Sequence, residues 1–484
     1  MDSREGVKME MLKVGITSFF RRNPEHSARL YRSAVCCFIL ASALSSVLAG
    51  EDAPRVDGYR GIWFTLGQMS ELGDKYSGGL GTYTANHNPM AVYSEKADKT
   101  FFTYGGTIKD KRHLLIMVSY YDHKTGQVPK PVMVHDKQGV DDPHDNAALN
   151  IDDKGHIWVF VSGRGRKRPG FKYRSKEPYS IAAFERIAEK EITYPQPWFI
   201  AEKGWLHLFT KYTKGRELYF DTSVDGRKWT DDVKLAGFGG HYQVSGVLGN
   251  KIATFFNYHP GGDVNKRTNL YYAQSVDFGM TWTTVDGTKL KLPLDKVKNP
   301  TLVIDFEAQK KLMYTCDLNF DSKGNPLLLY VTGHDYKPGP SGDPREFCLT
   351  RWDGKAWQTS VVGKTDHNYD MGSLWLNGDE WLVYAPTDPG PQPIGSGGEM
   401  CLWSSRDEGA TWTLKKKLTH NSELNHNYAR RPRYAKDPFY AYWADGNPNK
   451  MSPSRLYFSD SSGKVWRLPY DMTTDLATPE EVKP

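Results

Sequence analysis

Cysteine is scarce in this sequence, with five residues in 484. Two of them, Cys36 and Cys37, lie in an apolar N-terminal segment, and the other three are Cys316, Cys348 and Cys401. These three lack metal-ligand spacing, and they fit either one disulfide with a free thiol or three buried reduced thiols. P-loop, dinucleotide-binding and Ser/His/Asp-elbow motifs are also absent, which argues against nucleotide-dependent enzymes and α/β-hydrolases. We therefore expect no cofactor and no metal.

Long apolar runs are missing except near the N-terminus. Arg29 and Arg32 precede the apolar run 34–44, and Val47-Leu48-Ala49 then offers a small-residue cleavage site. This pattern predicts a signal peptide over residues 1–49 and an exported protein, periplasmic or extracellular. A signal anchor is the alternative, although so short a run spans a bilayer poorly. No later segment could cross a membrane, so we expect no stable membrane insertion after the signal is removed.

An excess of charge of one sign is lacking as well. The formal net charge is +6, and removal of residues 1–49 leaves 56 basic and 53 acidic side chains, or about +3. This balance does not indicate a nucleic-acid partner. We expect a monomer.

The sequence is rich in glycine, tyrosine and tryptophan, and long amphipathic helical patterns are absent, as in all-β proteins with many turns. Seven segments repeat one plan: a polar or small start, an apolar strand, a turn and a second apolar or aromatic strand. Their starts are 47 to 70 residues apart, which leaves room for one four-stranded blade each. The pattern predicts a seven-bladed β-propeller, with segments that start near His87, His144, Tyr194, His241, Asn299, Tyr369 and His426.

A second motif recurs in the outer half of several blades. Residues 275–282 and 405–412 both read S-x-D-x-G-x-T-W, residues 223–229 are a shortened version, and residues 352–357 and 462–466 are weaker echoes. The motif is typical of Asp-box (BNR-type) turns, in which the Asp caps turn N–H groups and the Trp packs between sheets. We interpret these turns as peripheral and structural.

The predicted propeller occupies residues 58–470. A closed ring often assembles one blade from both termini, and residues 61–64 and 464–468 suit that role. We expect residues 471–484 to be a polar, frayed tail.

In a propeller, the loops at one end of the innermost strands line a funnel. The segment starts should therefore converge there, and most of them carry His or Tyr. They are His87, His144, Tyr194, His241, Tyr369 and His426. Capping of turns near the axis is the alternative role for each of them.

Four short motifs carry a resemblance to a known family: residues 142–146 (DPHDN), 151–157 (IDxxGxI), 173–175 (YRS) and 193–196 (TYPQ). In this order they resemble BNR-repeat proteins that include seven-bladed ulvan lyases. The resemblance implies β-elimination at a uronic acid within an anionic polysaccharide. It assigns proton transfer to His144 and Tyr194, in an order left open. We expect Asp142 and Asp145 to favour the imidazolium form of His144.

The sequence departs from the family pattern at two positions. Arg164 stands where the family has a second histidine, and Lys211 or Arg216 must replace an expected arginine. We expect catalytic groups at His144, Tyr194, His241, Arg164 and Lys211. Substrate contacts are expected from His87, Tyr242, His259, Arg216 and His426.

Two further functions remain open. One is a sialidase-type glycoside hydrolase, which shares Asp boxes but needs an arginine triad, a Tyr/Glu pair and a further carboxylic acid. The other is a carbohydrate-binding propeller without turnover. The products separate the three: an unsaturated uronide, a free sugar without unsaturation, or neither.

Overall fold

The structure is a computed structural model that describes residues 52–63, 65, 67–76, 80–109 and 111–483. The predicted signal peptide lies outside this part of the chain. Within the described residues, no helix combines the length and the apolar character needed to cross a membrane.

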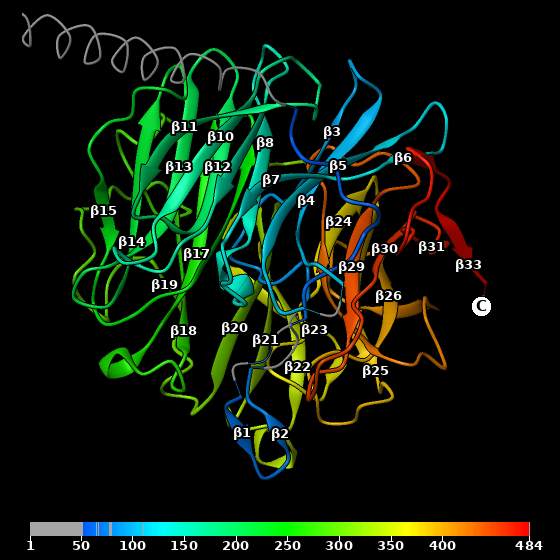
Figure 1. The fold of residues 1–484 in the computed structure, drawn as a ribbon. Helices are drawn as coiled ribbons and strands as arrows, with labels where there is room; N and C mark the ends of the chain where they lie inside the picture. The colour runs from blue at the N-terminus through cyan, green and yellow to red at the C-terminus, as the bar shows by residue number, and fades with distance from the viewer. Residues whose placement is uncertain (1–51, 64, 66, 77–79, 110, 484) are drawn as a thin grey trace, which may run out of the picture. The chain divides into compact units, whose positions relative to one another are not determined.

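Seven antiparallel sheets radiate around one axis and confirm the seven-bladed propeller (Figure 1). Blade 1 contains β3 (Ala91–Ser94), β4 (Lys99–Gly106), β5 (Leu115–Asp122) and β7 (Val132–Asp136). Blade 2 contains β8 (Ala147–Ile151), β9 (Ile157–Val161), β10 (Gly170–Ser175) and β11 (Phe184–Lys190). Blade 3 contains β12 (Thr193–Ile200), β13 (Gly204–Tyr212), β14 (Arg216–Ser223) and β15 (Val233–Ala236).

The remaining blades follow the same order from the axis outward. Blades 4 to 7 contain β16 (Gln243–Leu248), β17 (Lys251–Tyr258), β18 (Thr268–Ser275) and β19 (Leu302–Ile304); β20 (Leu312–Phe320), β21 (Pro326–Gly333), β22 (Arg345–Trp352) and β23 (Trp357–Thr365); β24 (Ser373–Asn377), β25 (Glu380–Asp388), β26 (Glu399–Ser405) and β27 (Thr413–Lys417); and β28 (Asn425–Arg430), β29 (Ala441–Gly446), β30 (Leu456–Ser459), β31 (Val465–Arg467) and β33 (Glu480–Val482).

Burial along each blade follows the residue types of its strands. The second strands are covered by neighbouring sheets on both faces, and β9 (IWVFV) is buried at every position. The outermost strands are polar, as in β27 (TLKKK), which blunts the exposed sheet edge. Apolar clusters fill the spaces between adjacent blades, for example Leu208 and Phe220 of blade 3 with Phe256 of blade 4.

Polar bonds cross the axis and tie blades that are not adjacent in the ring. The Nδ2 atom of Asn86 donates to Gln243 O at 2.8 Å, and that of Asn88 donates to Ser245 O at 2.7 Å, which joins blade 1 to blade 4. Arg431 of blade 7 pairs with Asp317 of blade 5 at 3.0 Å. The inner strands are therefore fixed relative to one another, which is a condition for a precise site at their ends.

The sequence-based account of the first hairpin of blade 5 was wrong. The segment that starts at Asn299 contains β19, the outermost strand of blade 4, and the inner strand of blade 5 begins only at Leu312. The two strands are apolar runs separated by the mostly polar residues 307–311, as in a hairpin, but they pair in different sheets. The three cysteines of the described chain are buried free thiols.

Ring closure also differs from the prediction. Blade 7 takes all five strands from the C-terminal part of the chain, so residues 61–64 do not enter it; Phe64 itself lies outside the described residues. Instead the N-terminal segment joins two blades, because Gly61 N donates to Ser454 O and Ile62 N to Gly105 O, both at 2.9 Å.

The C-terminal tail supplies the second closing element. The tail, which we expected to be frayed, adds β33 to β31, and its strand β32 (Leu476–Ala477) pairs with β6 (Val128–Pro129) beside blade 1. Both ends of the described chain thus join the first and last blades.

The Asp-box turns have the predicted geometry. Asp277 accepts from Thr281 N at 2.9 Å and from Thr281 Oγ1 at 2.6 Å, and Gly279, at φ +87°, donates to Ser275 Oγ at 2.9 Å. Asp407 repeats these bonds with Thr411. Trp282 is buried between the outer strands of blades 3 and 4.

We expect Asp277→Ala to lower the free energy of unfolding by about 1–2 kcal/mol, because it removes two or three hydrogen bonds of a turn. Thermal unfolding measures this loss, with Asp153→Ala, in an exposed turn of blade 2, as the control. Catalytic or binding activity should not change. A folded Asp277→Ala protein with lost activity would contradict the structural role of the box.

Candidate functional site

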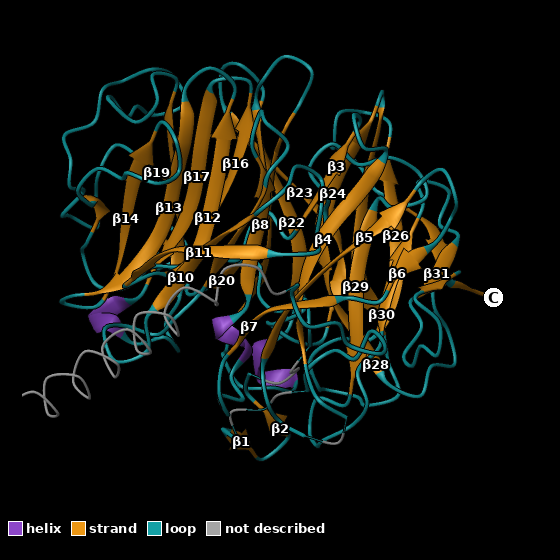
Figure 2. Ribbon diagram, turned by 45° about the horizontal axis from the view of Figure 1, so that its top comes forward, coloured by secondary structure: helices purple, strands orange, loops and turns teal. Residues whose placement is uncertain are grey.

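The site lies at one end of the ring, where loops lead into the inner strands. Three short 3-10 helices mark this end: η1 (Pro143–Asp145), η2 (Pro260–Gly262) and η3 (Pro340–Gly342). Figure 2 shows them on the same end as the small hairpin of β1 (Met69–Ser70) and β2 (Gly73–Asp74).

A narrow hollow lies near the axis; its space is about 330 Å³ when the part open to solvent is counted, of which about 10 Å³ is accessible to the centre of a water molecule. No Asp or Glu is among its described lining residues. They are Tyr83, Thr84, Asn86, His144, Tyr194, Tyr242, Asn257, Arg267, Tyr314, Thr315, Tyr369 and Met371. Five tyrosines, one histidine and one arginine are thus brought together from five blades and the segment before blade 1.

His144 is held by groups on both sides of its ring. Nδ1 lies 2.5 Å from Asp142 Oδ1, and Nε2 lies 2.7 Å from Tyr83 Oη. Because a carboxylate can only accept, Nδ1 carries the proton and Nε2 accepts from Tyr83. Arg168 anchors this arrangement through 2.7 and 2.8 Å bonds to Asp142 and Asp145.

The expected charge of His144 was wrong. Burial lowers its pKa to about 4, and Arg164 adds to the effect, although Asp142 opposes both. Asp145 is neutralised by Lys137, at 2.8 Å, as well as by Arg168. His144 is therefore a neutral imidazole at pH 7.

Tyr194 occupies a strained position at the start of β12. Its φ is +55°, which is uncommon for a bulky residue, and its N–H donates to Ser162 Oγ at 3.1 Å. Arg164 donates to Tyr194 Oη at 3.2 Å. Burial raises the pKa of Tyr194 well above its usual value, so its hydroxyl stays protonated at neutral pH.

Tyr242 has the opposite acidity. Burial alone would raise its pKa, but the positive charges of Arg216, Arg267 and Arg164 outweigh burial and lower the pKa to about 8. A hydrogen bond with Tyr194 contributes in the same direction. A tyrosine that ionises near pH 8 can accept a proton under mild conditions.

The arginines around Tyr242 make no direct ion pairs with the described acidic side chains, although the negative charge of Asp142 acts on Arg164. Within the described residues, Arg164, Arg216 and Arg267 form no ion pair with an Asp or Glu. Arg267 is only 5 % exposed, and its guanidinium carbon lies 4.6, 4.7 and 5.0 Å from the ring centres of Tyr242, Tyr314 and Tyr369. A buried cation is stabilised by a negative partner, so this arrangement favours an anionic ligand.

Sequence reasoning missed Arg267, Tyr83 and Tyr314. Arg267 lies before the third strand of blade 4 and Tyr83 before blade 1, so neither stands at the start of one of the repeated segments. Their positions come from the folded ring, and the local sequence carries no signal for them.

Three predicted histidines support the hollow without lining it. His87 Nε2 lies 3.1 Å from His144 O, and its Nδ1 accepts from Thr84 N. The ring nitrogens of His241 bond to the backbone at Asn257 O and Phe238 N, so it is not placed to exchange protons with a ligand. His259 is buried, with its ring centre 4.9 Å from that of Tyr242, and neither of its ring nitrogens has a hydrogen-bond partner among the described residues.

Two predicted residues lie elsewhere. Lys211 pairs with Asp232 at 2.9 Å in a network of charged side chains on blade 3. Arg216, in contrast, stays beside the hollow, where its guanidinium carbon lies 5.8 Å from the Tyr242 ring centre. His426 lines a separate pocket of blade 7, where Trp443 Nε1 donates to its Nδ1 at 2.9 Å.

The fold and the Asp-box turns define a seven-bladed propeller of BNR type. The sequence profile described as "BNR repeat-containing family member" matches residues 91–365. The chain belongs to this BNR repeat-containing family. Among proteins with curated descriptions, none matches the sequence significantly.

Solved structures with the same fold include polysaccharide lyases. One is described as an ulvan lyase of family PL25, with 16 % identity, a TM-score of 0.65, and coverage of 85 % of this chain and 96 % of that one. The structure described as this lyase bound to -[GlcA(1-4)Rha3S]- has 16 % identity and a TM-score of 0.64, and the match covers 85 % of this chain and 96 % of that one. The polysaccharide lyase Uly1 has 13 % identity and a TM-score of 0.58, and the match covers 84 % of this chain and 98 % of that one. Likeness at such identities shows a shared fold.

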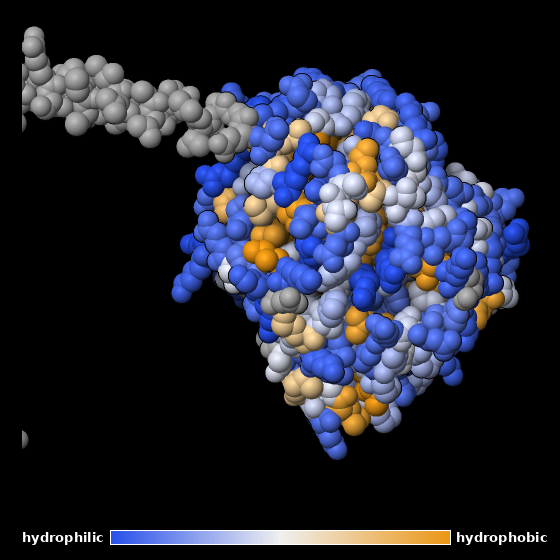
Figure 3. Space-filling view, turned by 45° about the vertical axis from the view of Figure 1, so that its right-hand side comes forward, coloured by the Kyte–Doolittle hydropathy of each residue, from blue (hydrophilic) through white to orange (hydrophobic). Residues whose placement is uncertain are grey.

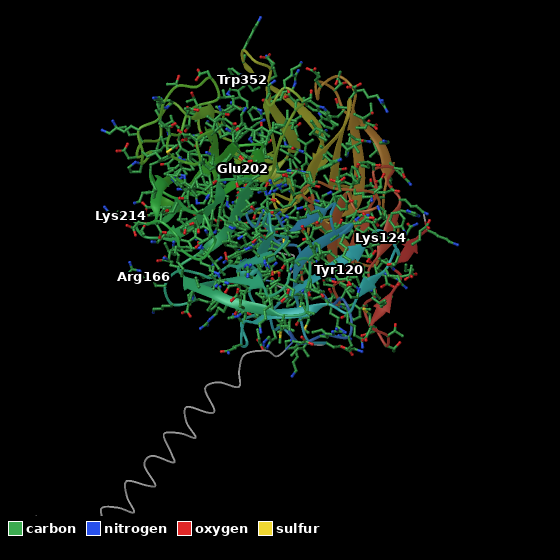
Figure 4. All side chains as sticks on the ribbon, turned by 90° about the horizontal axis from the view of Figure 1, so that it is seen from above. Tyr120, Lys124, Arg166, Glu202, Lys214 and Trp352 are labelled. Carbon is green, nitrogen blue, oxygen red and sulfur yellow. The ribbon has the colours of Figure 1, made fainter. Side chains whose placement is uncertain are left out.

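We expect one tyrosine to ionise with a midpoint near pH 8, seen as a rise in tyrosinate absorbance that Tyr242→Phe abolishes. In Arg267→Gln the midpoint should move upward, because tyrosinate loses a stabilising positive charge. Arg166→Gln is the matched control, since this side chain is 87 % exposed and lies at the rim (Figure 4). Tyrosinate that forms only at the pH of exposed tyrosines would contradict the assignment.

Proposed function

We propose that this chain is an exported polysaccharide lyase that cleaves a uronate-containing anionic glycan by β-elimination. The observation that carries the proposal is the group of three arginines, unpaired with carboxylates, around a tyrosine of lowered pKa. The lyase names of the similar structures support it as well.

The reaction requires a base for a weakly acidic carbon. The C5 proton of a uronate becomes acidic enough for removal only when the adjacent carboxylate is neutralised. Arg267 and Arg216 are suited to this task, because an incoming carboxylate would be their first acidic partner. The charge that they stabilise grows in the transition state, so they contribute to kcat as well as to binding.

Tyr242 is the proposed base and Tyr194 the proposed acid. Tyrosinate oxygen of Tyr242 takes the C5 proton, the C5–H electron pair forms the C4=C5 double bond, and the C4–O4 bond breaks. Tyr194 gives its proton to the leaving O4, and proton exchange with Tyr242 and solvent restores both residues. No water is consumed and no redox partner is needed.

His144 has a positioning role in this scheme. A neutral ring with Nδ1–H bonded to Asp142 cannot act as an acid at pH 7, but its Nε2 accepts the O–H of Tyr83 and so fixes the position of that side chain at the hollow. This assignment replaces proton transfer by His144 with proton transfer by Tyr242.

A sialidase-type hydrolase is the second candidate, and the arginine group is the observation that favours it. Such an enzyme also needs a carboxylic acid to protonate the leaving group. The described residues that line the hollow include no Asp or Glu, which favours the lyase.

A screen of uronate polymers tests the proposal: ulvan, alginate, polygalacturonate, hyaluronan and chondroitin sulfate. We expect one of them to yield product with the ultraviolet absorbance of a conjugated C4=C5 double bond. Tyr242→Phe and Tyr194→Phe should each lower kcat by roughly 10²–10⁴-fold. In the wild type, kcat/KM should rise as the pH passes about 8, because the tyrosinate form is the base.

Tyr434→Phe is the control for these variants, since this side chain is 61 % exposed. Saturated products would contradict the elimination, and binding of polymers without turnover would favour a carbohydrate-binding propeller. Full activity in both Tyr242→Phe and Tyr194→Phe would contradict the assigned site.

A further inference from the structure

A groove lies beside the hollow, between the β1–β2 hairpin and the loop that carries η3. It contains about 1170 Å³ of space, counting the part open to solvent. Its walls come from Gln68, Met69, Ser70, Glu71, Leu72, Lys75, Asp335, Tyr336, Lys337, Pro338, Pro340 and Ser341. Figure 1 shows the hairpin projecting below blade 5, and Figure 3 shows apolar surface among polar surface at this lower tip.

The groove is built by packing of the hairpin on the loop. Gly339, at φ +93°, allows Leu72 to approach so closely that a Cβ there would lie 2.3 Å from Leu72 Cδ1. Within the hairpin, Ser70 Oγ donates to Gly73 O at 3.0 Å, and Tyr76 N donates to Asp74 Oδ1 at 3.0 Å. The two walls are therefore held in contact at the tip.

Consecutive residues connect the groove to the hollow. Tyr76 packs edge-on against Tyr369 of the hollow, with 5.3 Å between ring centres. The next side chain, Lys75, belongs to the groove, and its Nζ lies 4.5 Å from the Tyr76 ring centre and 5.0 Å from that of Tyr336. A chain bound at Tyr369 could thus continue past Tyr76 to Lys75.

The groove carries equal numbers of basic and acidic side chains, Lys75 and Lys337 against Glu71 and Asp335, so an anionic group would be bound by Lys75 itself and not by a net positive charge. Within the described residues Lys75 forms no ion pair, and its Nζ makes a 3.4 Å bond to Gln68 Oε1. The nearby Asp335 uses its carboxylate within its own loop, for Lys337 N and for Ser341 Oγ at 2.8 Å. Burial lowers the pKa of Lys75, and the positive charge of Arg267 adds to this effect. An anionic group in the groove would relieve that repulsion.

We propose that this groove binds the sugars that adjoin the reacting uronate, with Lys75 facing an anionic substituent and Tyr336 contacting a sugar ring. The proposal rests on the proposed function, because it assumes a glycan in the hollow. A mixture of apolar rings and a few polar groups is the usual lining of such sites. The enzyme then prefers long chains to short ones.

Binding by size-fractionated oligosaccharides of the same five polymers tests this inference. We expect the wild type to bind octasaccharides more tightly than disaccharides. Lys75→Ala should weaken octasaccharide binding by about tenfold, because one hydrogen bond to a charged group is lost. Disaccharide binding should not change, because a disaccharide does not reach the groove. Tyr336→Ala should act in the same direction. Higher salt should reduce the difference between wild type and Lys75→Ala.

Lys124→Ala is the matched control, because this exposed lysine lies at the rim (Figure 4) and does not line the groove. Lys75→Arg keeps the charge and should retain most of the affinity, which separates charge from folding defects. Equal losses for short and long chains, or no loss in either variant, would overturn the groove assignment even if turnover is observed. Chain-length-dependent binding without any turnover would instead contradict the lyase and leave the groove standing.

Discussion

Positive charge gathered around the buried Tyr242 of the hollow is the constraint on which the site depends. Arg164, Arg216 and Arg267 form no ion pair with a carboxylate among the described residues, and the positive charges of all three lower the pKa of Tyr242. The same field that makes Tyr242 acidic attracts an anionic ligand. Affinity for a uronate and activation of a base therefore have one physical origin.

Such a site requires a rigid ring, because like charges repel and buried cations are costly. The rigidity comes from bonds that cross the axis, such as Asn88 to Ser245, and from both chain ends joining blades 1 and 7. The Asp boxes contribute at the periphery, far from the chemistry. The stabilising Asp-box turns thus lie at the periphery of the ring, and the arginines lie at one end of the inner strands.

Sequence reasoning found the ring because seven hairpins repeat, and it found Tyr194 and Tyr242 because they stand at strand starts. Arg164 follows the second strand of blade 2, and it was named from the family resemblance. It missed Arg267 and Tyr83, which reach the hollow only through the closed ring. The predicted charge of His144 was wrong for a related reason: the sequence shows the neighbouring Asp142 and Asp145, but it does not show burial or the cations Arg168 and Lys137 that neutralise them. The sequence suggested that both termini close the ring, but it did not show that the N-terminal segment hydrogen-bonds to blades 1 and 7 without adding a strand to blade 7.

The central claim is that the arginines bind the carboxylate of the substrate. Calorimetric titration of the wild type with an unsulfated uronate polymer, and with the same polymer after reduction of its carboxylates to alcohols, tests it most directly. The account predicts that reduction weakens binding at least about tenfold, because charged hydrogen bonds to arginine are lost. Equal affinity for the two polymers would contradict it.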